Sequence, residues 1–478
     1  MRALIHTDGS AIPTSRGEEG AGAGFVVIVP GASPDAVARA EPLAIPCSQN
    51  EAEYQAVALA LRAAAEMGAD EVLVRAEVVD DAAPALGVDH GGGIDERGER
   101  AGVSHFIEHL LFKGSEKYTA QEIAEIFDAL GGELNAATSR EHTVVYARVP
   151  DDKLETALDV MGEMVFAPAF AELDAEREVV LEEIAMYEDT PQELVHDLFS
   201  EAVFRSHALG RPVIGTADVI ASINKRTIGS YHRSMYAPGN VVISAAGNLQ
   251  HDRVVKLLER AQRTARNGGA RVRPPLVKIP PPGVRFQRKN TEQYHVCVGA
   301  PGISRSDRRR FAASLLDSIL GGSASSRLFQ EIREKRGLAY AVYSFAAQYT
   351  DTGLIGLYVG TREENLTECL ELATAEIADL AAGNVAEAEL ERAKENLKGR
   401  ILLSREATST RMSRLGRSLV TDTELLSLDR IAAEIDAVTA EAVAELAAVL
   451  LAPDRLSAAG IGPSETRFRE AVRRIDPS

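Results

Sequence analysis

The chain has 478 residues, a length typical of about two to four domains. Hydrophobic residues make up 45% of it and charged residues 26%, the composition of an ordinary soluble globular protein. The net charge of −19 argues against a nucleic-acid-binding surface over the whole molecule and fits a cytoplasmic protein.

The three cysteines, Cys47, Cys297 and Cys369, are far apart and form no CxxC pair. They argue against a disulfide framework or a cysteine-based zinc site, and we expect a reducing compartment. The first residues show no basic stretch followed by an apolar core, so no secretory signal is expected. No run approaches about 18 consecutive apolar residues, so we expect no membrane-spanning helix.

Residues 1–80 predict the order strand, strand, helix, strand, which indicates an incomplete α/β segment. The polar, glycine-rich stretch 80–102 is interpreted as a junction or a long loop. Beyond it, Thr119 and Glu122 have the spacing of a capping box and predict the start of a helix, which Gly131 is suited to end.

The rest of the chain repeats one pattern on either side of a linker. Alternation predicts a strand over 142–149, and the prolines and glycines of 267–283 predict the linker. After it we expect a strand, two helices, two strands and then long helices, with the first four of these elements at 294–302, 309–322, around 327–335 and near 339–350. Segments of about 190 residues on each side favour a duplicated α+β architecture.

The stretch "GVSHFIEHLLFKG", residues 102–114, places three ionisable groups in an otherwise apolar helix. His105, Glu108 and His109 stand at i, i+3 and i+4 and therefore share one face. Burying such groups is costly unless they are paired or bind a metal, and a zinc ion held by two imidazoles one turn apart resolves the conflict. The alternative is a pair of core histidines bonded to carbonyl groups, with Glu108 at a surface edge.

A catalytic zinc normally has three protein ligands, so a third should come from elsewhere in the chain. The helical stretch 171–191 contains Glu176, Glu182 and Glu183. Glu176 and Glu183 are two helical turns apart and share a face. A glutamate-rich helix is more often a solvated surface, so spacing alone leaves the third ligand open.

Five segments, in this order, resemble the insulinase/pitrilysin family of zinc peptidases. They are "AGVSHFIEHLLFKGS", "GGELNAATSREHT", "EREVVLEEIAMYEDTP", "HALGRPVIGT" and "GGSASSRLFQEIREKRGLAYAVYS". The similarity covers about residues 84 to 465 and is greatest to the bacterial branch that looks like the mitochondrial processing peptidase β subunit. The resemblance implies an α+β fold of two related clamshell domains, 84–266 and 284–470, each an antiparallel-rich sheet with helices. The implied activity is zinc-dependent endopeptidase cleavage of peptides or unfolded protein.

The resemblance also implies roles for individual residues, carried over position by position. His105, His109 and Glu183 match the ligands of Zn²⁺, and Glu108 matches the general base. Glu176 matches an acid that supports the site, as partners of metal ligands generally do.

Four further residues match substrate-binding positions. Asn135 and Ala136 match an edge strand to which the substrate adds as a further β-strand, although an ordinary sheet edge is an equal alternative. Arg333 and Tyr340 match a pair that closes over the substrate from the second domain.

The amino-terminal segment 1–80 resembles the ribonuclease H family in its reverse-transcriptase-like branch. Asp8 and Glu53 match two carboxylates that hold divalent metal, and Glu77 stands where an aspartate is expected. The rest of that fold is absent, so this α/β segment is incomplete and nuclease activity is not expected. The peptidase part in turn lacks its opening strand, and residues 71–79 are a candidate to fill that place.

Two other functions remain as alternatives. The first is a non-catalytic clamshell subunit, and the second is a fused or truncated product whose amino-terminal segment is a nucleic-acid-binding remnant. The sequence does not decide between a monomer and a homodimer.

Overall fold

The computed structural model describes residues 92–261 and 279–477, together with the backbone of the strands between residues 2 and 89. The chain divides into two compact units, each made of three segments. The first unit consists of Met1–Leu181, Val213–Arg273 and Leu403–Leu428, and the second of Glu182–Pro212, Pro274–Leu402 and Asp429–Ser478.

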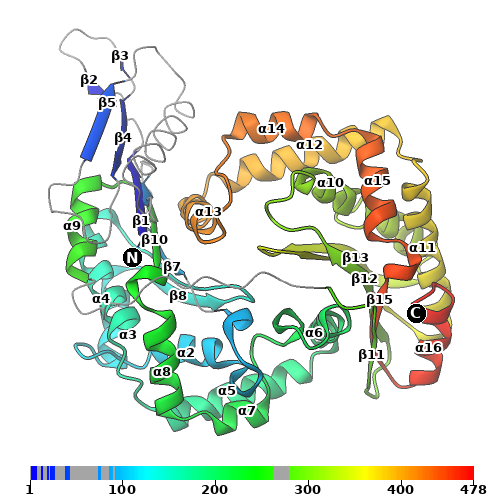
Figure 1. The fold of residues 1–478 in the computed structure, drawn as a ribbon, viewed down its shortest axis with the longest axis horizontal. Helices are drawn as coiled ribbons and strands as arrows, with labels where there is room; N and C mark the ends of the chain where they lie inside the picture. The colour runs from blue at the N-terminus through cyan, green and yellow to red at the C-terminus, as the bar shows by residue number, and fades with distance from the viewer. Residues whose placement is uncertain are drawn as a thin grey trace. The chain divides into compact units, whose positions relative to one another are not determined.

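The first unit is built on one sheet with the strand order β5-β4-β1-β10-β7-β9-β8, and β6 pairs with β1 outside this order (Figure 1). The strands are β1 (Arg2–Thr7), β4 (Gly22–Val26), β5 (Ala38–Pro42), β6 (Val74–Ala76), β7 (Ala85–Asp89), β8 (Glu133–Thr138), β9 (Thr143–Arg148) and β10 (Val242–Ala246). Strands β2 (Ile12–Pro13) and β3 (Glu19–Gly20) form a separate ribbon. Strand β1 runs parallel to β10 and to β6, and all other neighbours are antiparallel.

The opening strand of the first unit's sheet differs from the expectation. Strand β1 pairs with β10, with Arg2 opposite Val242, so the sheet is completed by the first residues of the chain and not by residues 71–79. The described residues of that stretch are β6, which lies against β1. The amino-terminal segment 1–80 also contains β5, a third antiparallel strand that the sequence pattern did not indicate. The helix predicted between β5 and β6 lies outside the described residues.

Eight helices of the described residues belong wholly or mostly to the first unit. They are α2 (Val103–Leu111), α3 (Ala120–Leu130), α4 (Leu154–Phe166), α5 (Leu173–Glu188), α7 (Ala217–Ser222), α8 (Lys225–Met235), α9 (His251–Ala261) and α13 (Thr408–Val420). The predicted capping box is present: the Thr119 side chain accepts from the Glu122 N–H, and the Glu122 carboxylate accepts from the Thr119 N–H. Gly131 ends α3 at φ 64°, in the left-handed region that favours glycine.

Helix α13 lies late in the chain but packs against β10 and β7 of the first unit. Met412 is buried with Ala246 of β10. A Cβ at Gly416 would stand 2.7 Å from Ser244 Oγ, so glycine permits the close approach of this helix to the strand. The predicted second domain, 284–470, therefore contributes one helix to the other unit.

The second unit is built on a sheet with the order β11-β15-β12-β14-β13. Its strands are β11 (Val284–Arg288), β12 (Tyr294–Gly302), β13 (Ala339–Gln348), β14 (Gly353–Thr361) and β15 (Ser457–Gly462). Its helices are α6 (Pro191–Phe204), α10 (Arg310–Leu320), α11 (Leu366–Ala381), α12 (Glu387–Ser404), α14 (Leu428–Asp436), α15 (Ala440–Leu450) and α16 (Glu465–Arg473). Figure 1 shows α11, α15 and α16 on one side of this sheet and α6 on the other.

Burial on both faces explains the unbroken apolar run of β12. Val296 and Val298 lie in the core with α10, α11 and α15, whereas Cys297 lies toward α6, with its Sγ 3.8 Å from Nδ1 of His196. The strand predicted at 294–302 is confirmed. The helix predicted around 327–335 is a π-helix over Phe329–Glu334, a rare form that occurs frequently at functional sites.

The prediction of a mixed helix-and-sheet fold is confirmed, whereas the clamshell arrangement and the ribonuclease H-like segment stay predictions. Most of the predicted linker 267–283 lies outside the described residues. No helix in the described parts of the chain is long and apolar enough to cross a bilayer.

Candidate metal centre

Helix α2 is apolar on the side that packs inside the first unit and polar on the other. Val103, Phe106, Ile107, Leu110 and Leu111 are fully buried. His105, Glu108 and His109, in contrast, are half-buried. The three ionisable groups are therefore less buried than the apolar residues between them.

The start of α2 is fixed by two glycines and one carboxylate. Gly102 is at φ 92°, and a Cβ there would stand 2.6 Å from the Ile214 carbonyl oxygen and 2.8 Å from Cα of Gly215. Only glycine allows this contact between backbones. The buried Glu96 carboxylate accepts from the N–H groups of Gly102 and Ser104, both at 2.7 Å, and so satisfies donors that the helix leaves free at its N-terminus.

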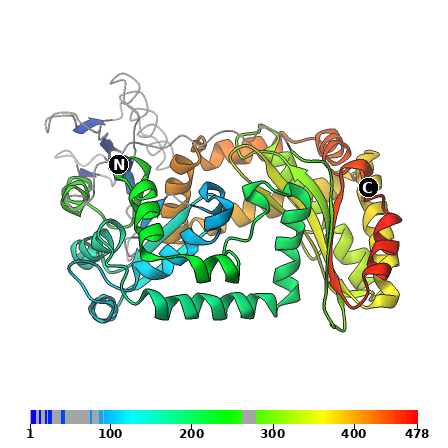
Figure 2. The same ribbon diagram turned by 60° about the horizontal axis from the view of Figure 1, so that its bottom comes forward.

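Helix α5 supplies the other half of the site and is one unbroken helix in Figure 2. It buries Val180 and Ile184 together with Glu176, which is 5% exposed. Glu183, two turns beyond Glu176, is half-buried. Glu182, the neighbouring residue, is exposed.

His105, His109 and Glu183 come together as a group that could hold a metal ion. Their ligand atoms, one from each side chain, all lie within 4.8 Å of one another. Within 92–261 and 279–477, no other group of three or more histidines, cysteines, aspartates and glutamates meets this condition. Two imidazole nitrogens and one carboxylate oxygen are donors that suit zinc in a catalytic site, where a fourth position stays open. The partial exposure of all three groups fits that open position.

The protonation of the two histidines also suits metal binding. Burial, with a smaller contribution from nearby His109, lowers the pKa of His105 to about 4, so the ring is neutral at pH 7. Nδ1 of His109 lies 2.9 Å from Oε1 of Glu176. Because a carboxylate only accepts, we assign the proton to Nδ1, and this tautomer leaves Nε2 as the atom that can bind a metal.

Glu108 is held by a residue that the sequence reasoning missed. The Thr138 hydroxyl, at the end of β8, donates to Oε2 of Glu108, and Thr143 Oγ1 lies 3.1 Å from Thr138 Oγ1. The only signal in the sequence was the position of Thr138, two residues after Ala136, on the same face of an extended strand. Strand β8 thus orients the carboxylate next to the metal ligands.

Strand β8 is the last strand in the order of its sheet, so Asn135 and Ala136 lie on an edge strand as predicted. The side-chain oxygen of Asn135 accepts from the Ala136 N–H at 2.8 Å. Whether a substrate strand pairs there stays a prediction.

Arg333 and Tyr340 lie together in the second unit. Cζ of Arg333 is 4.7 Å from the centre of the Tyr340 ring and 4.6 Å from that of Phe329, so the guanidinium contacts two aromatic faces. Tyr340 is 78% exposed, which leaves its hydroxyl accessible to a ligand. The amino-terminal carboxylates Asp8, Glu53 and Glu77 lie outside the described residues.

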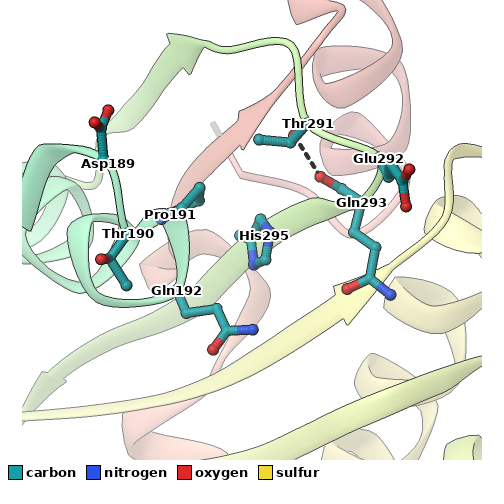
Figure 3. A pocket seen from close by; sticks show the side chains of 8 residues that line it. All are labelled: Asp189, Thr190, Pro191, Gln192, Thr291, Glu292, Gln293 and His295. Carbon is teal, nitrogen blue, oxygen red and sulfur yellow. Dashed lines mark hydrogen bonds between the residues drawn. The ribbon is translucent and has the colours of Figure 1, made fainter.

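A separate hollow of about 410 Å³ lies in the second unit, at the start of α6 and the loop before β12. Figure 3 shows its eight lining residues, Asp189, Thr190, Pro191, Gln192, Thr291, Glu292, Gln293 and His295. The Thr291 hydroxyl donates to the Gln293 carbonyl at 2.6 Å, and His295 contacts the Tyr358 hydroxyl at 2.8 Å. None of the predicted site residues lines this hollow.

Two family profiles match the chain in succession. The profile described as insulinase (peptidase family M16) matches residues 72–217, and the profile described as peptidase M16 inactive domain matches residues 222–397. The first match begins before residue 84, where the resemblance was expected to start, and it contains His105, His109 and Glu183.

Curated relatives cover most of the chain. A protein of Streptomyces coelicolor named as an uncharacterized zinc protease is 40% identical over 399 residues, which are 80% of this chain and 86% of that protein. A Bacillus subtilis protein with the same description is 40% identical over 377 residues, 77% of this chain and 91% of that protein.

Solved structures show the same fold. A protease from Helicobacter pylori matches with a TM-score of 0.75 at 22% identity, covering 80% of this chain and 94% of the other. A Pseudomonas fluorescens structure described as a peptidase M16 inactive domain matches with a TM-score of 0.73 at 25% identity, covering 80% and 93%. Profiles, relatives and fold agree with the resemblance noted in the sequence, and the chain belongs to the insulinase family, peptidase family M16.

Proposed function

We propose that this protein is a zinc-dependent endopeptidase that hydrolyses peptide bonds in short or unfolded polypeptides. The observation that carries the proposal is the grouping of His105, His109 and Glu183 with the Glu108 carboxylate on the same helix face as the two histidines. The names of the relatives, which call them zinc proteases, support zinc as the metal.

The chemistry follows from the residues in place. Zinc, when bound, supplies Lewis acidity that polarises a water and the peptide carbonyl and lowers the pKa of that water toward neutrality. Glu108, oriented by Thr138, accepts the proton from the water at its carboxylate and then returns it to the leaving amine. Glu176 keeps the His109 ring in place through Nδ1.

Substrate binding is proposed to use the backbone of β8. An extended peptide that pairs with Asn135 and Ala136 would be held by main-chain hydrogen bonds, which tolerate many sequences. Such pairing suits unfolded polypeptides, because a folded protein rarely offers a free strand.

The non-catalytic alternative lacks support at the site itself. A clamshell subunit without activity is expected to lack one or more of the five site residues, and this chain has His105, Glu108, His109, Glu176 and Glu183. The profile described as inactive covers only residues 222–397, after the last of these residues. A nucleic-acid-binding remnant in the amino-terminal segment and a homodimer stay predictions.

Removal of the metal tests the proposal directly. Purified protein is expected to contain about one zinc ion per chain and to cleave a quenched fluorogenic peptide, because the donor set suits a catalytic zinc. A strong chelator should abolish cleavage and added zinc should restore it, while an RNA–DNA hybrid stays intact. Cleavage that continues without bound metal would overturn the proposal.

Replacing Arg333 by Ala is expected to lower kcat/KM for the peptide on the order of 100-fold, because the guanidinium is proposed to donate hydrogen bonds near the developing oxyanion. Zinc content should not change, since Arg333 is not part of the ligand group. The matched control is Arg336→Ala on the same segment, where the guanidinium pairs with Glu331. An equal loss in both variants would remove the specific role of Arg333.

A further inference from the structure

Lys113 lies in the turn that follows α2, the helix that carries the two histidines. His105 and His109 share one side of the helix, and Lys113 comes four residues after His109. Lys113 stands just past the last residue of the helix, Leu111, where a cation is also favoured by the helix dipole.

The ammonium group of Lys113 is bound to a buried carboxylate. Its Nζ lies 2.6 Å from Oε2 of Glu176, and the Glu176 side chain is only 6% exposed. The other oxygen, Oε1, lies 2.9 Å from Nδ1 of His109. One carboxylate thus joins a metal-ligand candidate to a lysine, and both of its oxygens have a partner.

The charges of the ionisable groups at the site explain why a cation is favourable next to Glu176. Glu108, Glu176 and Glu183 bring three negative charges when ionised, whereas an imidazole that binds a metal is a neutral ligand. The buried carboxylate of Glu176 would be costly without a nearby cation. Three carboxylates also exceed the charge of one divalent ion. With Lys113 included, the protein contributes two net negative charges, which a zinc dication balances.

We propose that Lys113 is a positioning residue of the metal centre, which holds Glu176 against His109 and compensates its charge. This inference rests on the proposed function, because it assumes that His109 binds zinc. Lys113 is not part of the ligand group and acts through Glu176. Without the ammonium, Glu176 loses the contact that fixes one of its oxygens, and the His109 ring loses its fixed orientation.

The test measures zinc affinity by competition with a chromogenic chelator. Lys113→Met is expected to weaken zinc binding about tenfold, the lower end of the effect for partners of metal ligands. Lys113→Arg, which keeps the charge, should restore most of the affinity. At saturating zinc, kcat should stay within about twofold of the unmodified protein, because Lys113 takes no part in the chemical step.

The matched control is Lys117→Met. Lys117 lies four residues further along the chain, and its Nζ pairs with Asp159 at 2.5 Å on an exposed surface. Its replacement should leave zinc affinity unchanged. If Lys113→Met does not fold by circular dichroism, Lys113→Gln takes its place, since the amide keeps a donor without the charge.

A double-mutant cycle separates positioning from a general effect on the fold. If Lys113 acts through Glu176, Lys113→Met should have no further effect on zinc affinity in a Glu176→Gln background. Additive losses, or wild-type zinc affinity in the single Lys113→Met variant, would overturn the inference. An unmodified protein that binds no zinc would instead refute the proposed function itself.

Discussion

Replacement of Glu108 by Gln is expected to leave zinc bound and to lower kcat for peptide cleavage by about 10⁴-fold, the upper end of the effect of a general acid–base group. The effect should be large because one carboxylate serves twice, first taking the proton from water and then giving it to the amine. Glutamine has nearly the same shape, and its amide oxygen can still accept from the Thr138 hydroxyl. The fold and the metal site should therefore persist while the base is lost.

Zinc content, circular dichroism and single-turnover cleavage of a quenched peptide would be compared between Glu108→Gln and a control, Glu116→Gln. Glu116 is an exposed carboxylate a few residues beyond the helix and should be replaceable without loss of activity. Normal turnover in the Glu108 variant would exclude this residue from the mechanism. Loss of zinc from it would show instead that Glu108 helps to hold the metal.

Replacement of Glu183 by Ala is expected to weaken zinc binding by more than about 100-fold and to stop cleavage at ordinary zinc concentrations. Loss of a supporting partner costs roughly 10- to 100-fold in metal affinity, and loss of a direct ligand should cost more. Only His105 and His109 would then remain in the group, and two ligands do not complete a catalytic zinc site.

The adjacent residue provides a close control for this variant. Glu182 is exposed, and one step along a helix turns a side chain by about 100° away from its neighbour. Glu182→Ala should therefore keep both zinc and activity, although it removes the same charge from the same helix. Equal zinc affinity in the two variants would show that the metal takes its third ligand elsewhere.

The parts of this protein that could be predicted from sequence depend on neighbours along the chain. The repeat of the α-helix alone brings His105 and His109 to one side, and Thr119 with Gly131 marks the two ends of α3. The alternation of β9 and the apolar run of β12 were likewise readable, because each reflects which faces of one strand are buried.

The residues that complete the site could not be predicted from local sequence patterns. Spacing placed Glu176 and Glu183 on one face, but only the packing of α5 brought Glu183 to the histidines and left Glu182 in solvent. The hydroxyl of Thr138 and the ammonium of Lys113 became significant only through the carboxylates they contact. Such contacts join residues from separate elements, so no periodicity in the sequence reveals them.

The sequence by itself determined the capped and periodic elements and the two-histidine face of α2, since these follow from short-range sterics and from which faces are buried. The family was recognised separately, by the resemblance of five motifs. Only the tertiary structure decided that β1 completes the first sheet beside β10, that α13 packs on that sheet, and which glutamate joins the histidines. These choices depend on how much apolar surface each arrangement buries across the whole chain. The total apolar surface buried depends on contacts between segments that are distant in the sequence, so it is determined only in the folded chain.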